Sequence, residues 1–207
     1  MYETFEKLPD HRKEQIVQVC IEEFARNGYT NTSTNTIVKR LGISKGLLFL
    51  YFKSKKNLYL YLVDYLTEII VDYFFEETKE GEERRPLNSF GNLGEYYKTL
   101  LQQKPDYILF MLEAFLNTPV DIRTEIETKH GKVHEHFIQH LDTEGFRKDV
   151  DLEAVANLLH LTTFHIGQMV FTDYQETENI NRNIEKYLDM FSKCMDVIKY
   201  GVYERNV

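Results

Sequence analysis

The sequence has no tryptophan and only two cysteines, and it contains no long uncharged apolar run. Cys20 and Cys194 lie far apart within apolar helical patterns, and neither belongs to a CxxC pair or a metal-ligand spacing. We therefore expect two reduced core thiols. The first residues, MYETFEKLPDHRKEQ, lack the apolar core of a signal peptide, and no apolar stretch approaches the roughly 18 residues that a transmembrane helix needs. These absences predict a cytoplasmic protein without a membrane partner.

Apolar and aromatic side chains are abundant, whereas charge is unevenly distributed. Of the 207 residues, 43% are apolar, and 14 Phe and 14 Tyr are among them. This composition is typical of a globular protein and excludes disorder over most of the chain. Residues 1–60 carry ten Lys and Arg against six Asp and Glu, a net charge of +4. Residues 61–207 carry fifteen against twenty-seven, a net charge of −12. This asymmetry predicts a small basic module joined to an acidic body, each with its own partner.

Helical periodicity runs along the whole chain, and no segment has the pattern of a β-strand. Apolar residues that recur every three or four positions predict a first helix over residues 11–27. Asp10 is placed to cap the start of this helix, and Gly28 to end it in a left-handed conformation. Further helices are predicted over 56–75, at three places between 90 and 145, and over 151–173 and 179–200, with a polar loop at 76–89. The predicted fold class is all-α.

Two short helices separated by a tight turn follow the first helix. Thr30–Asn35 offers several hydroxyl and amide caps for a helix that stops at Gly42. Ser44 can cap a third helix that begins at Lys45, after a connection of about three residues. Two helices joined by so short a turn containing glycine form the helix-turn-helix signature.

The same turn admits an enzyme interpretation. Gly42-Ile43-Ser44-Lys45-Gly46 matches G-x-S-x-G, the nucleophile elbow of α/β-hydrolases. That elbow needs a preceding strand and downstream acidic and histidine partners on a parallel sheet, whereas the preceding STNTIVKRL has a helical pattern. We favour a turn followed by a cap, and we assign no catalytic residue and no cofactor. A hydrolase that uses Ser44 is the alternative.

The run EEFARNGYTNTSTNTIVKRLGISKGLLFLYFKSKKNLYLYL resembles the TetR family of bacterial transcriptional regulators. A Gly-Tyr helix end, a Thr and Ser cap cluster, Leu-Gly-Ile-Ser, Lys-Gly, an apolar-aromatic helix ending in Tyr-Phe, and Lys-Ser-Lys-Lys follow in the family's order. The resemblance implies a homodimeric repressor, with a DNA-binding domain over residues 1–54 and an effector-binding and dimerisation domain over 55–207. A small apolar or amphipathic effector would release it from a palindromic DNA operator.

The resemblance makes Lys45–Phe52 the recognition helix that enters the major groove. The helix N-termini near Ser33 and Ser44 suit phosphate, because their free N–H groups carry positive partial charge. Lysines at and after the helix add charge that neutralises the DNA backbone. The residues expected to contact DNA are Ser33, Thr34, Ser44, Lys45, Gly46, Leu47, Leu50, Tyr51 and Lys55.

The recognition helix departs from the family pattern. The family most often has Thr or a similar small residue at position 47, Tyr at 49 and His at 50, where this chain has Leu47, Phe49 and Leu50. Leu48 and Phe52 lie one turn apart and are expected to anchor the helix. Apolar groups in the major groove recognise thymine methyls, so our hypothesis is that Leu47 and Leu50 favour T-containing steps. The alternatives are that both leucines pack against the next helix, and that the chain is a helical interaction module that has lost DNA binding.

An aromatic stripe in the middle of the chain supplies a candidate effector pocket. Such stripes are more often core, but in a ligand-responsive bundle some members line an apolar pocket with few polar groups. The candidate pocket residues are Tyr65, Tyr97, Tyr107, Phe110, Met111, Phe115 and His134. His130, His134, His136 and His140 form two i,i+4 pairs, but the pairs lie about 120° apart on a helix, which argues against one four-histidine metal site. We predict no metal.

The last two predicted helices have wide apolar faces that need a partner. We predict that they pair with the same helices of a second copy in a four-helix interface. The predicted interface residues are Val155, Leu159, Thr162, Ile166, Met169, Ile184, Phe191 and Ile198.

Overall fold

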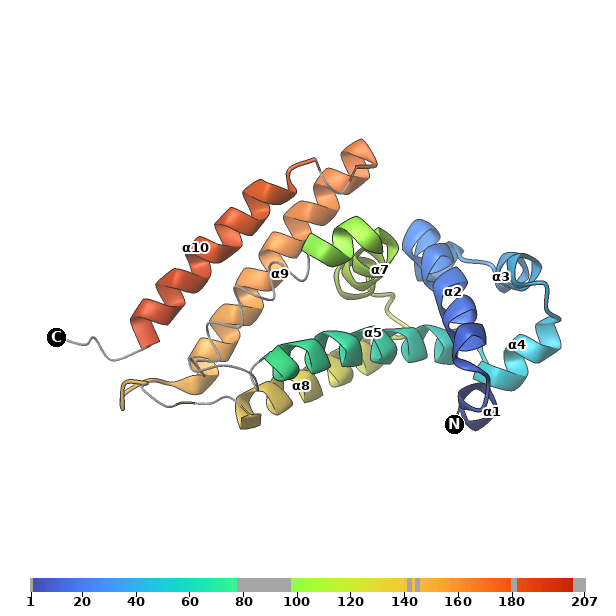
Figure 1. The fold of residues 1–207 in the computed structure, drawn as a ribbon, viewed down its shortest axis with the longest axis horizontal. Coiled ribbons are helices and arrows are strands. Elements are labelled where there is room, and N and C mark those ends of the chain that lie inside the picture. Colours follow the sequence, from blue (N-terminus) through green and yellow to red (C-terminus); the bar gives the residue numbers. More distant parts are fainter. Residues whose placement is uncertain (1, 78–97, 141–142, 144–145, 180–181, 203–207) are drawn as a thin grey trace. The chain divides into compact units, whose positions relative to one another are not determined.

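The computed structural model describes residues 2–77, 98–140, 143, 146–179 and 182–202. Helices make up most of these residues, and no β-strand occurs among them, so the prediction of an all-α fold is confirmed. The predicted loop at 76–89 overlaps the end of one helix and otherwise lies outside the described residues. The helices are α1 (Glu3–Glu6), α2 (Asp10–Asn31), α3 (Thr34–Leu41), α4 (Lys45–Phe52), α5 (Lys55–Glu77), α7 (Pro105–Leu116), α8 (Arg123–His140), α9 (Leu152–Thr177) and α10 (Ile184–Val202), and residues 98–103 are also helical (Figure 1).

The chain forms two compact units, and each unit is built from two separate stretches of sequence. The first unit contains Met1–Glu68 and Asp106–Thr128. The second unit contains Ile69–Pro105 and Lys129–Val207. Helices α5 and α8 therefore begin in the first unit and end in the second.

The ends of α2 differ in detail from the sequence prediction. Pro9 is the N-cap residue, so Asp10 is the first helical residue rather than the cap. The Asp10 carboxylate still lies in the first turn, where it interacts favourably with the helix dipole. Gly28 has the expected positive φ, 67°, but its ψ of 172° is extended, and a helical turn resumes as far as Asn31. The hydroxyl of Thr32 donates back to the Gly28 carbonyl at 2.7 Å, which closes this kinked end.

Aromatic rings form the core of the first unit. Phe5 of α1 lies 4.7 Å from Phe52 of α4 and 5.3 Å from Tyr61 of α5, measured between ring centroids. On the other side of the unit, Phe24 of α2 lies 5.0 Å from Tyr59 of α5. Four of these rings are fully buried, and only Tyr61 keeps part of its surface open. Because each aromatic pair contributes about 0.5–1.5 kcal/mol beyond the area it buries, these contacts hold α4 firmly against α1 and α5.

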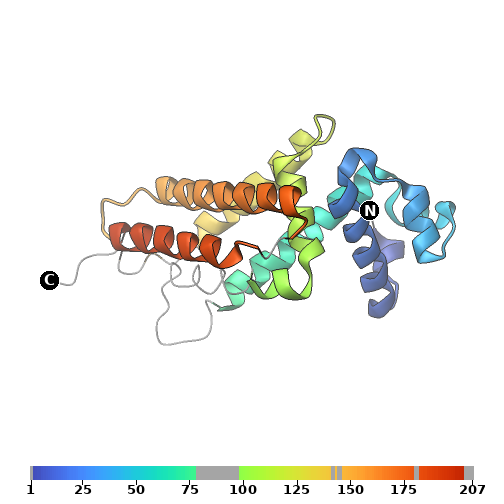
Figure 2. The same ribbon diagram turned by 90° about the horizontal axis from the view of Figure 1, so that it is seen from above.

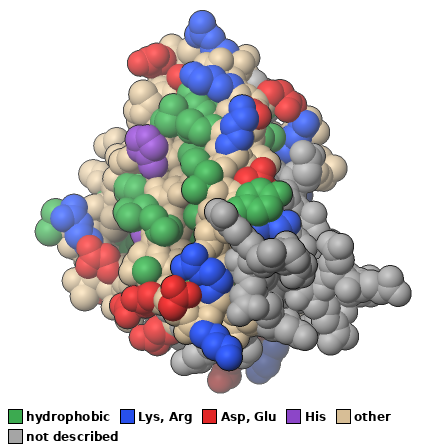
Figure 3. All heavy atoms as spheres, turned by 90° about the vertical axis from the view of Figure 1, so that its left-hand side faces the viewer, with side chains coloured by type: hydrophobic (Ala, Val, Ile, Leu, Met, Phe, Trp, Pro, Cys, Tyr) green, Lys and Arg blue, Asp and Glu red, His purple; other side chains and the backbone are tan. Residues whose placement is uncertain are grey.

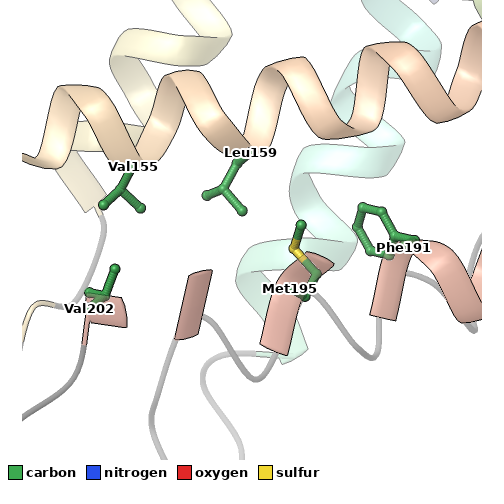
Figure 4. Packing of buried hydrophobic residues seen from close by; sticks show 5 residues of the cluster. All are labelled: Val155, Leu159, Phe191, Met195 and Val202. Carbon is green, nitrogen blue, oxygen red and sulfur yellow. The ribbon is translucent and has the colours of Figure 1, made fainter. Parts of the chain in front are cut away.

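Helices α9 and α10 pack against each other in the second unit, side by side in two perpendicular views (Figures 1 and 2). Val155 and Leu159 of α9 point toward Phe191, Met195 and Val202 of α10 (Figure 4). All five side chains are buried. The apolar stripes recognised in the sequence therefore join these two helices within one chain.

Polar contacts fix the ends of the α9–α10 pair. Asp151 caps α9, and one of its carboxylate oxygens accepts two backbone N–H groups of the first turn at 3.0 and 3.2 Å. Asp173 accepts hydrogen bonds from Asn183 at 2.5 Å and from the Tyr187 hydroxyl at 2.6 Å. Burial, together with this bond to Asp173, raises the pKa of Tyr187 to about 12. A turn brings Asn183 to Asp173, and α10 begins only after it, at Ile184, five residues after the predicted start.

We expect Gly28→Ala to lower the free energy of unfolding by about 2–4 kcal/mol, because it combines backbone strain with a clash. A Cβ at Gly28 would lie 2.5 Å from a carboxylate oxygen of Glu113. Gly42 shares the positive φ but has open space around it, so Gly42→Ala should lose only about 1–2 kcal/mol. Gly131→Ala, in open space on α8, should gain up to about 1 kcal/mol. Urea denaturation measures all three, and equal losses at Gly28 and Gly42 would contradict a role for the Glu113 contact.

Candidate nucleic-acid interface

Helices α3 and α4 form the predicted helix-turn-helix, and a serine caps the start of each helix. Ser33 Oγ accepts the backbone N–H two residues later at 3.2 Å, and Ser44 Oγ accepts the one three residues later at 3.1 Å. Gly42 has φ 64° and ψ 33°, the left-handed conformation that ends α3. The N–H of Ile43 returns to the Val38 carbonyl at 3.1 Å, as in a Schellman turn. The turn is thus fixed by its own backbone and by Ser44.

The hydrolase interpretation of this turn is not supported. A nucleophile elbow needs a strand in front of the serine, and the element in front of Ser44 is the helix α3. Ser44 Oγ is also engaged as a helix cap. The G-x-S-x-G match therefore reflects a turn and a cap.

Helix α4 has an anchoring face buried in the first unit. Leu48 and Phe52 are 1% and 0% exposed, as their spacing predicted. Tyr51 is also buried, with its ring 5.7 Å from the ring of Phe5. Its predicted contact with DNA stays a prediction, and only a small part of this side chain is available for it.

The other face of α4 is open. Ser44, Lys45 and Gly46 are exposed at its start, and Leu47 is half-buried. Leu50 is 50% exposed, so at least half of its side chain is not packed against α5. Lys45 Nζ lies 5.9 Å from the centre of the Phe49 ring. The open face therefore offers a short apolar surface beside a helix N-terminus and a lysine.

The start of α3 carries further exposed polar side chains. Ser33 is exposed and Thr34 is half-buried, and both were predicted to contact DNA. Asn35, Thr36 and Lys39 are exposed as well, although no DNA contact was predicted for them. Of these three residues, only Asn35 lies in the cap-rich segment from Thr30 to Asn35, whose members cannot be divided into buried and exposed residues without the fold.

Arg40 is a structural residue of the domain rather than an available cation. Its guanidinium donates to Glu23 Oε1 at 2.8 Å and also to the carboxylate of Glu22. Glu23 is only 6% exposed, so Arg40 neutralises a buried carboxylate and ties α3 to α2. Partial burial raises the pKa of Glu22, but hydrogen bonds from Arg40 and Gln18 outweigh it and hold the pKa below its usual value.

Lys55 and Lys56 are likewise engaged inside the first unit. Lys55 Nζ donates to the Thr30 carbonyl at 3.1 Å and lies 4.8 Å from the centre of the Tyr29 ring. It therefore caps the C-terminal end of α2, where the helix dipole favours a cation. Lys56 Nζ donates to the Asp121 carbonyl at 3.1 Å and pairs with Glu125. The predicted DNA contact of Lys55 stays a prediction.

The candidate pocket residues do not form one group in the described structure. Phe110 is fully buried, 5.1 Å from Tyr59 and 6.3 Å from Phe24, and Tyr107 is 6% exposed, so both belong to the core of the first unit. The half-buried residues of the set are Tyr65, Met111 and Phe115. Tyr97 and the side chain of His134 lie outside the described residues. A pocket lined by these residues stays a prediction.

Helices α9 and α10 expose apolar side chains that were not among the predicted interface residues. Val155, Leu159, Ile184 and Phe191 are buried within the chain, whereas Thr162, Ile166, Met169 and Ile198 are half-buried. The exposed large apolar residues are Leu158, Leu161 and Phe164 on α9, and Val197 and Tyr200 on α10. Figure 3 shows hydrophobic side chains gathered in a band on one face, with charged side chains around it. The stripe that periodicity identified thus includes residues that α9 and α10 use for each other, and its predicted part in a dimer interface stays a prediction.

Residues 16–62, which include the helix-turn-helix, match the sequence profile of the bacterial regulatory proteins of the tetR family. This N-terminal domain therefore belongs to the TetR family. The matched residues run from the middle of α2 into α5, so they contain both serine caps, the Gly42 turn and the whole of α4.

Curated proteins with similar sequences carry the names of HTH-type transcriptional regulators. The HTH-type transcriptional regulator QacR of Staphylococcus aureus is 44% identical over 52 residues, which are 25% of this chain and 28% of that protein. The uncharacterized HTH-type transcriptional regulator YuxN of Bacillus subtilis is 26% identical over 133 residues, 64% of this chain and 44% of that protein. The matched segments therefore span less than half the length of these relatives.

Solved TetR-family structures share the fold over nearly the whole chain. A TetR family transcriptional regulator from Chloroflexus aurantiacus has a TM-score of 0.57 at 21% identity, covering 98% of each chain. The transcriptional regulator FadR of Bacillus subtilis, in complex with stearoyl-CoA, has a TM-score of 0.64 at 16% identity, covering 86% of this chain and 96% of that one. At such identities the likeness shows the fold of this chain and nothing further.

The part of the chain that the structure describes offers neither a membrane span nor a metal site. None of the helices there combines the length and apolar character needed to cross a membrane. The described side chains contain no cluster of three His, Cys, Asp or Glu that could bind a metal ion. The side chains of the four histidines of α8 lie outside this description.

Because Arg40 balances the buried Glu23, we expect Arg40→Met to lower the free energy of unfolding by about 1–3 kcal/mol. Adding Glu23→Gln should recover part of this loss, since no buried charge then lacks its partner. Lys39→Met is the matched control on the exposed side of α3, and it should change stability by less than about 0.5 kcal/mol. Urea denaturation measures these values. Equal effects at positions 39 and 40 would show that Arg40 has no structural role.

Proposed function

We propose that the protein is a transcriptional repressor that binds a palindromic DNA operator as a homodimer and leaves it when a small apolar or amphipathic effector binds. The open face of α4 carries the proposal, because it presents a helix of the size and position that a major groove accepts. The proposed DNA-binding domain covers residues 1–54 and the effector and dimerisation domain covers 55–207. The proposed location is the cytoplasm.

Exposed groups around α4 support a DNA-binding role. The N-termini of α3 and α4, at Ser33 and Ser44, present backbone N–H groups that suit phosphate oxygens. Lys39, Lys45 and Lys53 are exposed on or next to these helices and would neutralise phosphates. Leu50 and the open part of Leu47 would contact thymine methyls in the groove. Base specificity would then rest on apolar contacts more than on hydrogen bonds.

The exposed apolar residues of α9 and α10 support dimerisation through this helix pair. Scattered apolar residues are normal on a surface, but here Leu158, Leu161, Val197 and Tyr200 are all at least half exposed on two helices that pack together. Burying such a surface against the same surface of a second copy gives a four-helix interface with two-fold symmetry. A two-fold dimer would place two recognition helices about 34–36 Å apart, one turn of DNA, and so accounts for a palindromic operator.

The effector is proposed to bind in the larger helical domain. One structural relative, FadR of Bacillus subtilis, is in complex with stearoyl-CoA, an amphipathic molecule with a long acyl chain. In this chain the half-buried Met111 and Phe115 are the aromatic-stripe residues of α7 that retain open surface. Effector binding would favour a dimer whose heads no longer match the operator, with a coupling free energy of about 1–3 kcal/mol.

In vitro selection of duplexes from a random pool tests DNA binding directly. We expect enrichment of a palindrome whose half-sites are one helical turn apart, with affinity that falls steeply as salt rises. Leu50→Ala should then weaken binding about three- to tenfold, since it removes apolar contact area. Replacing the contacted thymine by uracil should weaken wild-type binding and leave Leu50→Ala unaffected. Absence of any enriched sequence would instead favour a helical interaction module that does not bind DNA.

Leu161→Glu should convert the dimer to a monomer, because it places a charge in the proposed apolar interface. Leu161 is 60% exposed, so the substitution should leave the fold of the chain intact. Val120→Glu is the matched control, since Val120 is 82% exposed in the first unit. Sedimentation equilibrium measures the mass and circular dichroism the helix content. A dimer that survives Leu161→Glu with unchanged affinity would exclude this face.

A further inference from the structure

The connection between α4 and α5 is only two residues long, Lys53 and Ser54, and the first of them has an unusual backbone conformation. Lys53 has φ 66° and ψ −43°, which lies outside the left-handed helical region and close to a γ-turn of positive φ. The N–H of Ser54 donates to the Phe52 carbonyl at 2.7 Å, which is the hydrogen bond of such a turn. A turn of this kind is rare, and it is strained for a residue that has a Cβ.

Packing on both sides imposes this turn on the chain. Phe52, the residue before it, is fully buried, and its ring centroid lies 4.7 Å from that of Phe5. Ser54, the residue after it, caps α5, because its hydroxyl accepts the backbone N–H of Asn57 at 3.1 Å. With both neighbours held, the chain must turn within the single residue Lys53. Backbone strain persists only where the surrounding structure fixes it in this way.

Glycine would adopt this conformation at less cost, so a lysine here requires an explanation. Elsewhere among the described residues of the first unit, the positions of positive φ are the glycines Gly28 and Gly42. The Lys53 side chain is exposed, so burial of apolar surface does not offset its strain. A residue with a Cβ does, however, confine the turn to a narrower range of conformations than glycine would allow. The side chain at position 53 therefore stiffens the connection between α4 and α5.

We propose that Lys53 is a positioning residue, whose strained turn keeps α4 in the orientation that the ring contacts set, at the expense of stability. This inference rests on the proposed DNA-binding function, in which α4 enters the major groove. A helix that is already oriented in the free protein loses less conformational freedom on binding, so more of its interaction energy appears as affinity. The charge of Lys53 can neutralise a phosphate as well, but that role needs no strained backbone.

Lys53→Gly and Lys53→Ala separate the backbone from the charge, because both remove the ammonium group and only glycine relieves the strain. We expect calorimetry to give a Tm for Lys53→Gly about 2–6 °C above that of Lys53→Ala. Fluorescence anisotropy should nevertheless show Lys53→Gly binding the selected palindromic duplex about three- to tenfold more weakly than Lys53→Ala. Both variants should bind a duplex of random sequence equally, since nonspecific binding follows charge. A residue that only stabilised the fold would move Tm and affinity in the same direction.

Glu178, at the C-terminal end of α9, provides the matched control. It is also exposed and has a positive φ of 51°. Glu178→Gly should raise the Tm relative to Glu178→Ala and leave the affinity for the palindromic duplex unchanged. Hydrogen exchange gives a measurement without DNA: the amides of α4 should exchange faster in Lys53→Gly than in Lys53→Ala, although the glycine variant has the higher Tm.

The outcomes distinguish this inference from the proposed function. If the wild-type protein binds the palindrome and the two variants at position 53 bind it equally, the positioning role is wrong and the proposed function stands. A Tm for Lys53→Gly no higher than that of Lys53→Ala, or equal exchange of the α4 amides, would overturn the inference as well. A wild-type protein that binds no duplex would refute the proposed function, and the positioning role with it.

Discussion

The aromatic packing around Phe52 is the contact on which the rest of the N-terminal unit depends. Phe52 is fully buried and meets the rings of Phe5, Tyr2 and Tyr61, so the last residue of α4 is held by both α1 and α5. A helix of eight residues is too short to be stable by itself in water. Its orientation, and with it the direction of every exposed side chain on α4, therefore comes from these ring contacts.

Some basic residues of the first unit are engaged in contacts within it, whereas others remain exposed. The burial of their surroundings explains the difference. Arg40 is paired because Glu23 is buried and requires a cation. Lys55 lies over the end of α2, where unpaired carbonyls and the Tyr29 ring attract a charge. Lys45 and Lys53, with Lys39, keep their surface open. The net positive charge of the first sixty residues thus overstates the charge that remains exposed at the surface.

Sequence periodicity predicted best those features that depend on a single helix and its ends. The serine caps, the left-handed Gly42 and the buried pair Leu48 and Phe52 are set by local hydrogen bonding and by helical phase, which neighbouring residues reveal. For α9 and α10 it left the partner of the apolar face undecided. A heptad pattern indicates that a face is covered, but the same pattern fits a partner within the chain and a partner in a second copy.

The sequence by itself determined the all-α class, the helix-turn-helix and its caps, because these follow from spacing and from short-range backbone chemistry. Only the tertiary structure decided that Phe110 fills the core, that Lys55 caps α2, and that Leu161 stays open. It alone brought Tyr2 and Tyr61 together, from positions far apart in the chain. Such contacts depend on which helices pack together, and helical phase along one element carries no information about its partner.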